Sequence, residues 1–238
     1  MADPLGAVVS VRGEAQRTVT PDSAVFACVI AATRPSKPTA LGAATQALDH
    51  LTAALMHLGG VPLTADTERH ALTWSAFSTR THSEHEHQPK TGRHEPTGQI
   101  VASVDLNLAV RDFTLLDNVG EVLSRQGDLH VVHVAWQVDD DNPSWSMVRA
   151  DAIHAAVNQA RHYTQALGGS LVRIEHIADA GLLGENHGAR TMRAAFAAAH
   201  GMAGGDGSDV PSLDPVPQKI TAAIEARFIA DGMSINHT

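Results

Sequence analysis

The sequence predicts an α/β fold of the α+β type, in which a mixed, largely antiparallel sheet is packed by two to three long helices. Segments whose apolar residues recur every three or four positions alternate with segments in which every second residue is apolar. Glycine pairs separate them, because Gly59-Gly60 and Gly168-Gly169 each follow a helical segment and precede an extended one. This alternation indicates helices that return directly into strands.

The stretch from Asn142 to Asp179 shows the pattern most clearly. Asn142 is suited to cap a helix whose first residue is Pro143, where a missing N–H costs nothing, and Gly168-Gly169 end that helix. Its small and apolar residues form one stripe that we expect to lie on a sheet. They are Ala150, Ile153, Val157, Ala160, Thr164 and Leu167. After the glycines, apolar and charged residues alternate, which predicts a strand.

The first part of the chain predicts two strands and a helix. Residues 7–15 form the first strand, and a polar link over 14–21 follows it. Residues 22–33 are apolar on both faces, which is typical of a central strand. After Pro38 a helix runs to Leu58 with leucines at spacings of three and four.

Residues 68–81 and 99–110 predict an antiparallel pair, the second with nearly ideal alternation. A helix capped by Asp112 and a strand over 129–138 follow. The order strand, helix, strand, strand, helix, strand is the split β-α-β pattern of a ferredoxin-like core. A last strand over 218–230 returns to the sheet, so we expect one domain over 7–230 with a flexible insertion at 181–217.

Composition excludes several classes of partner. The chain has 238 residues, 43% of them hydrophobic, and a formal charge of −9 from 17 basic and 26 acidic residues. This charge repels phosphate backbones and anionic membranes, so we expect no nucleic acid partner. No apolar run is long enough for membrane insertion. Since no signal peptide is recognisable, the expected location is cytoplasmic, or periplasmic if this is a mature or truncated form.

Cys28 is the single cysteine, so no disulfide can form within the chain. It lies in the apolar run of the second strand, where a small buried side chain is expected in preference to a reactive thiol.

The most unusual local feature is a His-rich loop over 82–98. Imidazoles and carboxylates together are a reasonable ligand set for zinc or another divalent transition metal. The candidate ligands are His82, His85, His87 and His94, accompanied by Glu84, Glu86 and Glu95. Their spacing matches no closed structural zinc pattern, and a plain exposed loop is the competing interpretation.

Other polar groups have simpler explanations. The acidic residues before Asn142 favour the start of a helix. His154 and His162 are two helical turns apart, and the odd spacing of His130 and His133 on a strand predicts opposite faces. No nucleophile elbow, phosphate loop or dinucleotide motif occurs. We therefore expect no catalytic residue, no cofactor and no enzyme.

Four stretches together resemble the SIMPL domain family, over about residues 7–230. They are VVSVRGEAQRTVTPDSAVFACVI, LMHLGGV followed by TADTE, RADAIHAAVNQARHYTQALGGSLVRIEHI, and the late strand KITAAIEARFI. The first carries a bend at Gly13 and Ala15 and a Pro21-Asp22 entry to the second strand. Ala15 stands where the family often has glycine, and the aromatic residue often found at the start of the strand after the His-rich loop is absent.

The resemblance implies an assembly or interaction role and supplies no catalytic residue. Family members are associated with oligomeric envelope proteins, oxidative stress and, in animals, a kinase-signalling partner. The expected function is therefore a non-enzymatic, self-associating homo-oligomer that serves as a scaffold or interaction protein. The alternative is a metal-binding or small-ligand-binding protein that uses residues 82–94.

Overall fold

The computed structural model describes residues 6–88, 93–181 and 213–234. They form two compact units, and each unit has its own sheet. The terminal unit consists of the described residues within Met1–Val19, Asp140–Ser208 and Lys219–Thr238. The central unit consists of those within Thr20–Asp139 and Asp209–Gln218.

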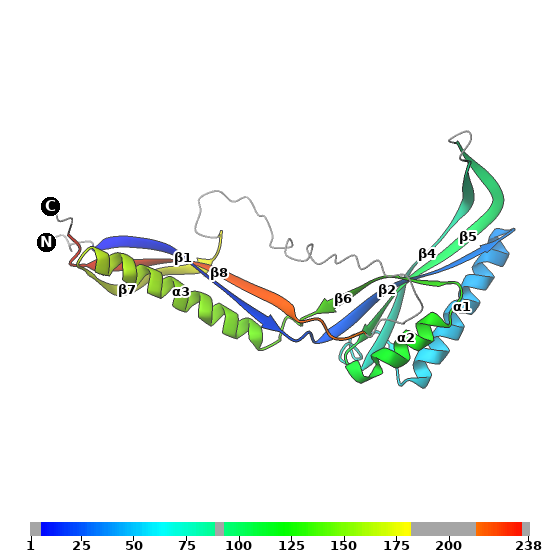
Figure 1. The fold of residues 1–238 in the computed structure, drawn as a ribbon, viewed down its shortest axis with the longest axis horizontal. Coiled ribbons are helices and arrows are strands. Elements are labelled where there is room, and N and C mark those ends of the chain that lie inside the picture. The colour runs from blue at the N-terminus through cyan, green and yellow to red at the C-terminus, as the bar shows by residue number, and fades with distance from the viewer. Residues whose placement is uncertain (1–5, 89–92, 182–212, 235–238) are drawn as a thin grey trace. The chain divides into compact units, whose positions relative to one another are not determined.

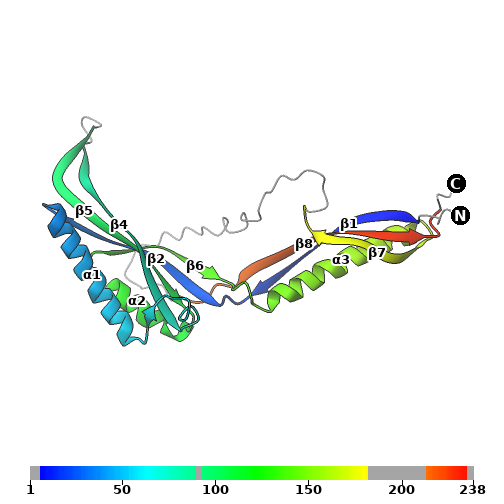
Figure 2. The same cartoon turned by 180° about the vertical axis from the view of Figure 1, so that it is seen from behind.

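The terminal unit is a three-stranded sheet with one long helix on one face (Figures 1 and 2). Its elements are β1 (Ala7–Val19), α3 (Ser144–Ala166), β7 (Ser170–Asp179) and β8 (Gln218–Asp231). In the sheet β8 lies between β1 and β7, and β7 pairs antiparallel with β8. The last strand was expected to join the sheet of the central elements. That expectation is wrong, because β8 pairs with the other strands of the terminal unit.

Small side chains bring α3 close to the sheet. Ala152, Ala156 and Ala160 are completely buried against apolar residues of β1 and β8. A Cβ built on Gly13 of β1 would lie 2.0 Å from the carbonyl oxygen of Ala152, so only glycine fits there. The strand backbone therefore touches the helix backbone directly.

The expected stripe on this helix is only partly correct. Ala160 and Thr164 are buried, but Ala150 and Leu167 are exposed, and alanines take the central positions of the contact. At so short a helix-to-sheet distance the larger Ile153 and Val157 fit only at the flanks, where they are partly buried.

The central unit is a five-stranded sheet whose order is β3-β4-β5-β2-β6. Its strands are β2 (Ser23–Arg34), β3 (Val61–Pro62), β4 (Leu72–Gln88), β5 (Arg93–Val110) and β6 (Leu129–Gln137). Its helical elements are α1 (Lys37–His57), the 3₁₀ turn η1 (Phe113–Leu115) and α2 (Leu116–Ser124). Only β3 pairs parallel, with β4, so the sheet is mixed and largely antiparallel.

Helices α1 and α2 contribute to one hydrophobic core with one face of this sheet. The core includes Phe26 and Ile30 of β2, Leu106 of β5, Leu55 of α1 and Val119 of α2. This confirms an α+β fold with helices packed on a mixed sheet. The order places β5 between β2 and β4, and the ferredoxin-like subtype stays a prediction.

Local sequence explains where α1 begins and ends. Ser36 and Thr39 form a reciprocal capping box, and Pro38 occupies the first turn. Gly59 follows with a positive φ of 80°, the conformation that ends many helices. The helix expected between Pro38 and Leu58 is therefore confirmed, although it begins at Lys37, before Pro38, and ends at His57.

Several strand boundaries differ from expectation. Strand β1 continues through the expected polar link as far as Val19. Strand β4 begins only at Leu72, so His70 lies in a turn and not on a strand face. The expected loop over 82–98 is mostly strand, since β4 reaches Gln88 and β5 begins at Arg93. Residues 82–85 are polar and exposed or half-buried, so they carry no hydrophobic alternation and their sequence resembles a loop.

The expected insertion at 181–217 lies mostly outside the described residues. In the part of the chain that is described, none of the helices combines the length and the apolar character needed to cross a membrane.

Cys28 is 2% exposed in the core of the central unit, as the apolar run predicts. Burial raises the pKa of its thiol from the ordinary value of 9.0 to about 11. Below pH 9 the thiol is protonated in both the folded and the unfolded chain. Between about pH 9 and 11 the unfolded thiol ionises first, so the free energy of unfolding should fall by roughly 1.4 kcal/mol per pH unit.

Urea unfolding at neutral pH and near pH 11 tests this expectation. The loss of stability between the two pH values should be smaller in Cys28→Ala than in the wild type. Equal losses in both proteins would show that other groups account for the pH dependence.

Candidate functional site

The His-rich segment forms a two-stranded arm of the central sheet (Figures 1 and 2). Strand β2 ends at Arg34, opposite Ile100 of β5. Beyond this point β4 and β5 pair only with each other, as far as Gln88 opposite Arg93. A two-stranded hairpin is only marginally stable on its own. Because the arm extends beyond β2, the core of the central unit adds little to its stability.

The register of the arm brings the predicted metal ligands near one another along the backbone. His87 lies directly opposite His94, and His85 is two positions from His87 on β4. A bulge between Ser83 and His85 separates these positions from His82. The side chains of His82 and His85 are exposed, and a ring nitrogen of His85 is 3.0 Å from the Ser83 carbonyl oxygen.

The side chains of His87 and His94 lie outside the described set. Among the side chains that are described, no three His, Cys, Asp or Glu gather closely enough to hold a metal ion. The four-histidine site therefore stays a prediction, supported by the backbone register alone.

His130 and His133 correct another expectation. They oppose Val29 and Ala27 of β2, two residues apart, so they share the face of the sheet opposite α1 and α2. The register shift at Ala27 and Cys28 inserts one extra residue into β6 and cancels their odd spacing. Both side chains are exposed.

A partly buried charge cluster joins the ends of three strands in the central unit. The Arg111 guanidinium donates two hydrogen bonds, of 2.6 and 3.2 Å, to the carboxylate of Asp139, and a third to the Glu68 carbonyl oxygen. The Asp22 carboxylate accepts the backbone N–H of Asp139 at 2.8 Å. The hydrogen bonds from Arg111 to Asp139 raise the pKa of the Arg111 guanidinium above its ordinary value.

The expected role of the acidic residues before Asn142 is therefore incomplete. Asp139 neutralises Arg111, while Asn142 accepts the backbone N–H of Ser144 at 2.9 Å. The helix itself begins at Ser144, one residue later than expected. Because every charge of this cluster faces a partner, we interpret it as structural.

Strand β7 is an edge of the terminal sheet and exposes large apolar side chains. It is hydrogen-bonded to β8 on one side, and the described residues place no strand on its other side. Val172, Ile174 and Ile177 are 59%, 52% and 45% exposed. An open edge with apolar side chains readily pairs with another chain.

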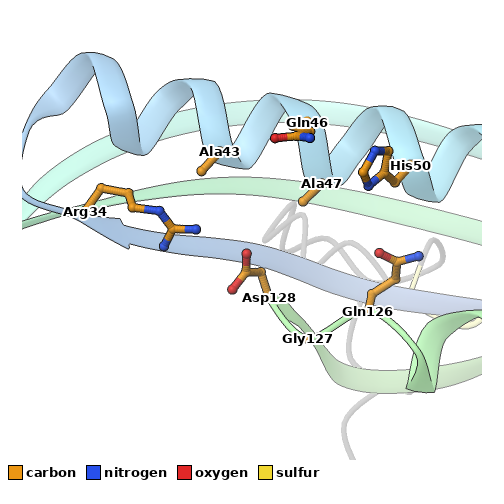
Figure 3. Close-up of a pocket in the computed structure, with 8 residues that line it drawn as sticks. All are labelled: Arg34, Ala43, Gln46, Ala47, His50, Gln126, Gly127 and Asp128. Carbon is orange, nitrogen blue, oxygen red and sulfur yellow. The ribbon is translucent and has the colours of Figure 1, made fainter.

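A shallow groove lies in the central unit between α1 and the end of β2 (Figure 3). Its volume is about 320 Å³. It is lined by Arg34, Ala43, Gln46, Ala47, His50, Gln126, Gly127 and Asp128. Sequence reasoning missed it, because its charged residues are almost a hundred positions apart and belong to no motif.

Comparison with protein families matches nearly the whole chain to a family model. The SIMPL family, described as "Protein of unknown function (DUF541)", matches residues 9–228, which is nearly the whole chain. This chain belongs to the SIMPL family. No curated protein matches it.

Residues that carried the family resemblance have defined positions in this SIMPL chain. Gly13 is the point where β1 touches α3. Asp22, the acidic residue after Pro21, ties the start of β2 to the end of β6 through Asp139. Gly13 therefore acts in packing within the terminal unit, and Asp22 in joining strands within the central unit.

Proposed function

We propose that this SIMPL protein is a non-enzymatic, self-associating scaffold or interaction protein. The observation that supports the proposal is the apolar edge of β7, which no further strand of the described residues covers. A role in oxidative stress rests on the family resemblance alone.

Two of the exposed apolar side chains of β7, Ile174 and Ile177, lie on the face that carries α3. Ile174 opposes Phe228 of β8 and Ile177 opposes Ala226, and these partners are buried beneath α3. The helix packs mainly over β1 and β8, so the isoleucines on β7 remain in water. Each isoleucine is already about half buried, so covering the rest in an interface would contribute roughly 0.7–1.5 kcal/mol.

Strand addition by a second copy fits this edge. The added strand would take up the backbone groups of β7, and its side chains would cover Ile174 and Ile177. The backbone groups and the two isoleucines all belong to β7, so point substitutions in this strand can test the proposal.

Multi-angle light scattering of the full chain at micromolar concentration tests the proposal. We expect an assembly for the wild type and a smaller particle for the double variant Ile174→Lys, Ile177→Lys, because charges on an edge strand oppose pairing. Met56→Lys is the matched control, since Met56 is a 56% exposed apolar residue of α1 in the central unit. A wild-type monomer would remove the proposal.

The second candidate function is metal binding by His82, His85, His87 and His94. The opposed register positions of His87 and His94 favour it over an ordinary hairpin tip. A metal bound there would also add stability to an arm with only two strands.

Repeating the light scattering with chelator and then with zinc separates the two candidates. An assembly that chelator does not disrupt supports the scaffold proposal. A particle whose mass increases only when zinc is added supports metal binding by the arm. Equilibrium dialysis that detects no stoichiometric zinc, copper or nickel would exclude this metal site.

A further inference from the structure

The groove in Figure 3 presents two opposite charges to the same space. Arg34 at the end of β2 and Asp128 in the turn before β6 point toward one another. In the described part of the chain no ion pair joins them, and the Arg34 side chain donates only to the neighbouring Thr33 carbonyl oxygen, at 2.7 Å. Most donors of the guanidinium and both carboxylate oxygens of Asp128 therefore remain for a ligand.

Backbone hydrogen bonds fix the elements that carry these charges. Arg34 is in register with Ile100 of β5. The Asp128 carbonyl oxygen accepts the N–H of Ala31 at 2.8 Å, and the Gln126 carbonyl oxygen accepts that of Leu129 at 3.2 Å. The backbone positions that carry the two charges are thus held by hydrogen bonds of the sheet.

Helix α1 forms the opposite wall. Ala43, Gln46, Ala47 and His50 are three or four positions apart and so lie on one face of the helix. The alanines keep the groove open, while His50 points into it and Gln126 points toward α1 from the other wall (Figure 3). Amide and imidazole groups therefore surround the two charges.

We propose that this groove binds a free α-amino acid with a polar side chain. The carboxylate of the ligand pairs with Arg34, its ammonium group pairs with Asp128, and its side chain reaches the amides of Gln46 and Gln126. A guanidinium binds a carboxylate through two parallel hydrogen bonds, which a simple cation does not match.

Size and exposure set the expected affinity. The volume of about 320 Å³ is at the lower end of the range of roughly 300–1,000 Å³ for ligand pockets. Arg34, Gln46 and His50 are exposed, so water competes for each contact. We expect a dissociation constant of about 1 mM.

Saturation-transfer difference NMR on the full chain tests the proposal with three probes. L-glutamine carries both charges, N-acetyl-L-glutamine lacks the ammonium group, and L-glutaminamide lacks the carboxylate. We expect saturable binding of L-glutamine and about tenfold weaker binding of each analogue, because each loses one charge-assisted contact. Equal binding of either analogue, or no binding of L-glutamine, would overturn the proposal.

Two substitutions of groove residues locate the contacts. Arg34→Gln should weaken L-glutamine binding about tenfold, and Asp128→Asn should remove its advantage over N-acetyl-L-glutamine. Arg125→Gln is the control, since Arg125 lies next to the same turn but pairs with Glu121. If Arg34→Gln and Arg125→Gln weakened binding equally, the overall charge of the protein, and not a specific contact with Arg34, would explain the binding. The test does not depend on self-association, because the groove and β7 belong to different units.

Discussion

Replacing Gly13 with alanine should destabilise the terminal unit by about 1–3 kcal/mol or more. The added Cβ would lie 2.0 Å from the Ala152 carbonyl oxygen and 2.7 Å from the Ala156 backbone nitrogen. Backbone atoms cannot move aside as a flexible side chain does, so β1 and α3 must separate. Hydrogen exchange should become faster in peptides from β1 and α3 and stay unchanged in α1.

Gly42→Ala is the matched control for this prediction. Gly42 lies on α1 with nothing within 4 Å of the added Cβ. Alanine is the better helix former, so the same chemical change should stabilise the central unit by about 0.5–1 kcal/mol. If both variants changed stability in the same direction, the contact of Gly13 with α3 would not govern the terminal unit.

Replacing Arg111 with methionine should cost the central unit about 2–4 kcal/mol. The side chains of Arg111 and Asp139 are only 21% and 17% exposed, and the substitution leaves the Asp139 carboxylate with the more distant Arg69 at 3.7 Å. Urea unfolding followed by far-ultraviolet circular dichroism measures the loss. Peptides at the start of β2 and the end of β6 should exchange faster.

Two further variants show whether the charge pair itself is responsible. Adding Asp139→Leu to Arg111→Met should restore part of the stability, since no buried charge is then left without its partner. Arg125→Ala breaks the exposed pair with Glu121 and should change stability by less than about 0.5 kcal/mol. A cost for Arg111→Met as small as that of Arg125→Ala would contradict the structural role of the cluster.

The elements that could be predicted from the sequence are those whose one face is apolar. The leucines of α1 and the alternation of β5 make their periods visible, and Ser36, Gly59 and Gly168 mark helix ends. Residues 82–85 of β4 show no such pattern because their polar side chains are exposed or half-buried. On α3 the alanines that pack most closely carry the weakest hydrophobic signal, so the expected stripe was displaced.

Contacts between residues far apart in the sequence could not be predicted for a different reason. Asp139 was interpreted from its neighbours in sequence, although its partner Arg111 is 28 residues away. The bulge in β6 that brings His130 and His133 to one face depends on pairing with β2, which single-strand periodicity does not report. The groove likewise exists only after α1, β2 and the turn before β6 have come together.

The terminal sheet has a consequence for how the protein is made. Strand β1 leaves the ribosome before the central unit, yet its neighbour β8 lies roughly 200 residues later in the chain. The central unit is almost continuous in sequence and should fold before β8 has been synthesised, when β1 still lacks this partner strand. During this interval β1 is available to the β8 of another nascent copy, so an exchange of terminal strands between molecules is a natural risk of this fold.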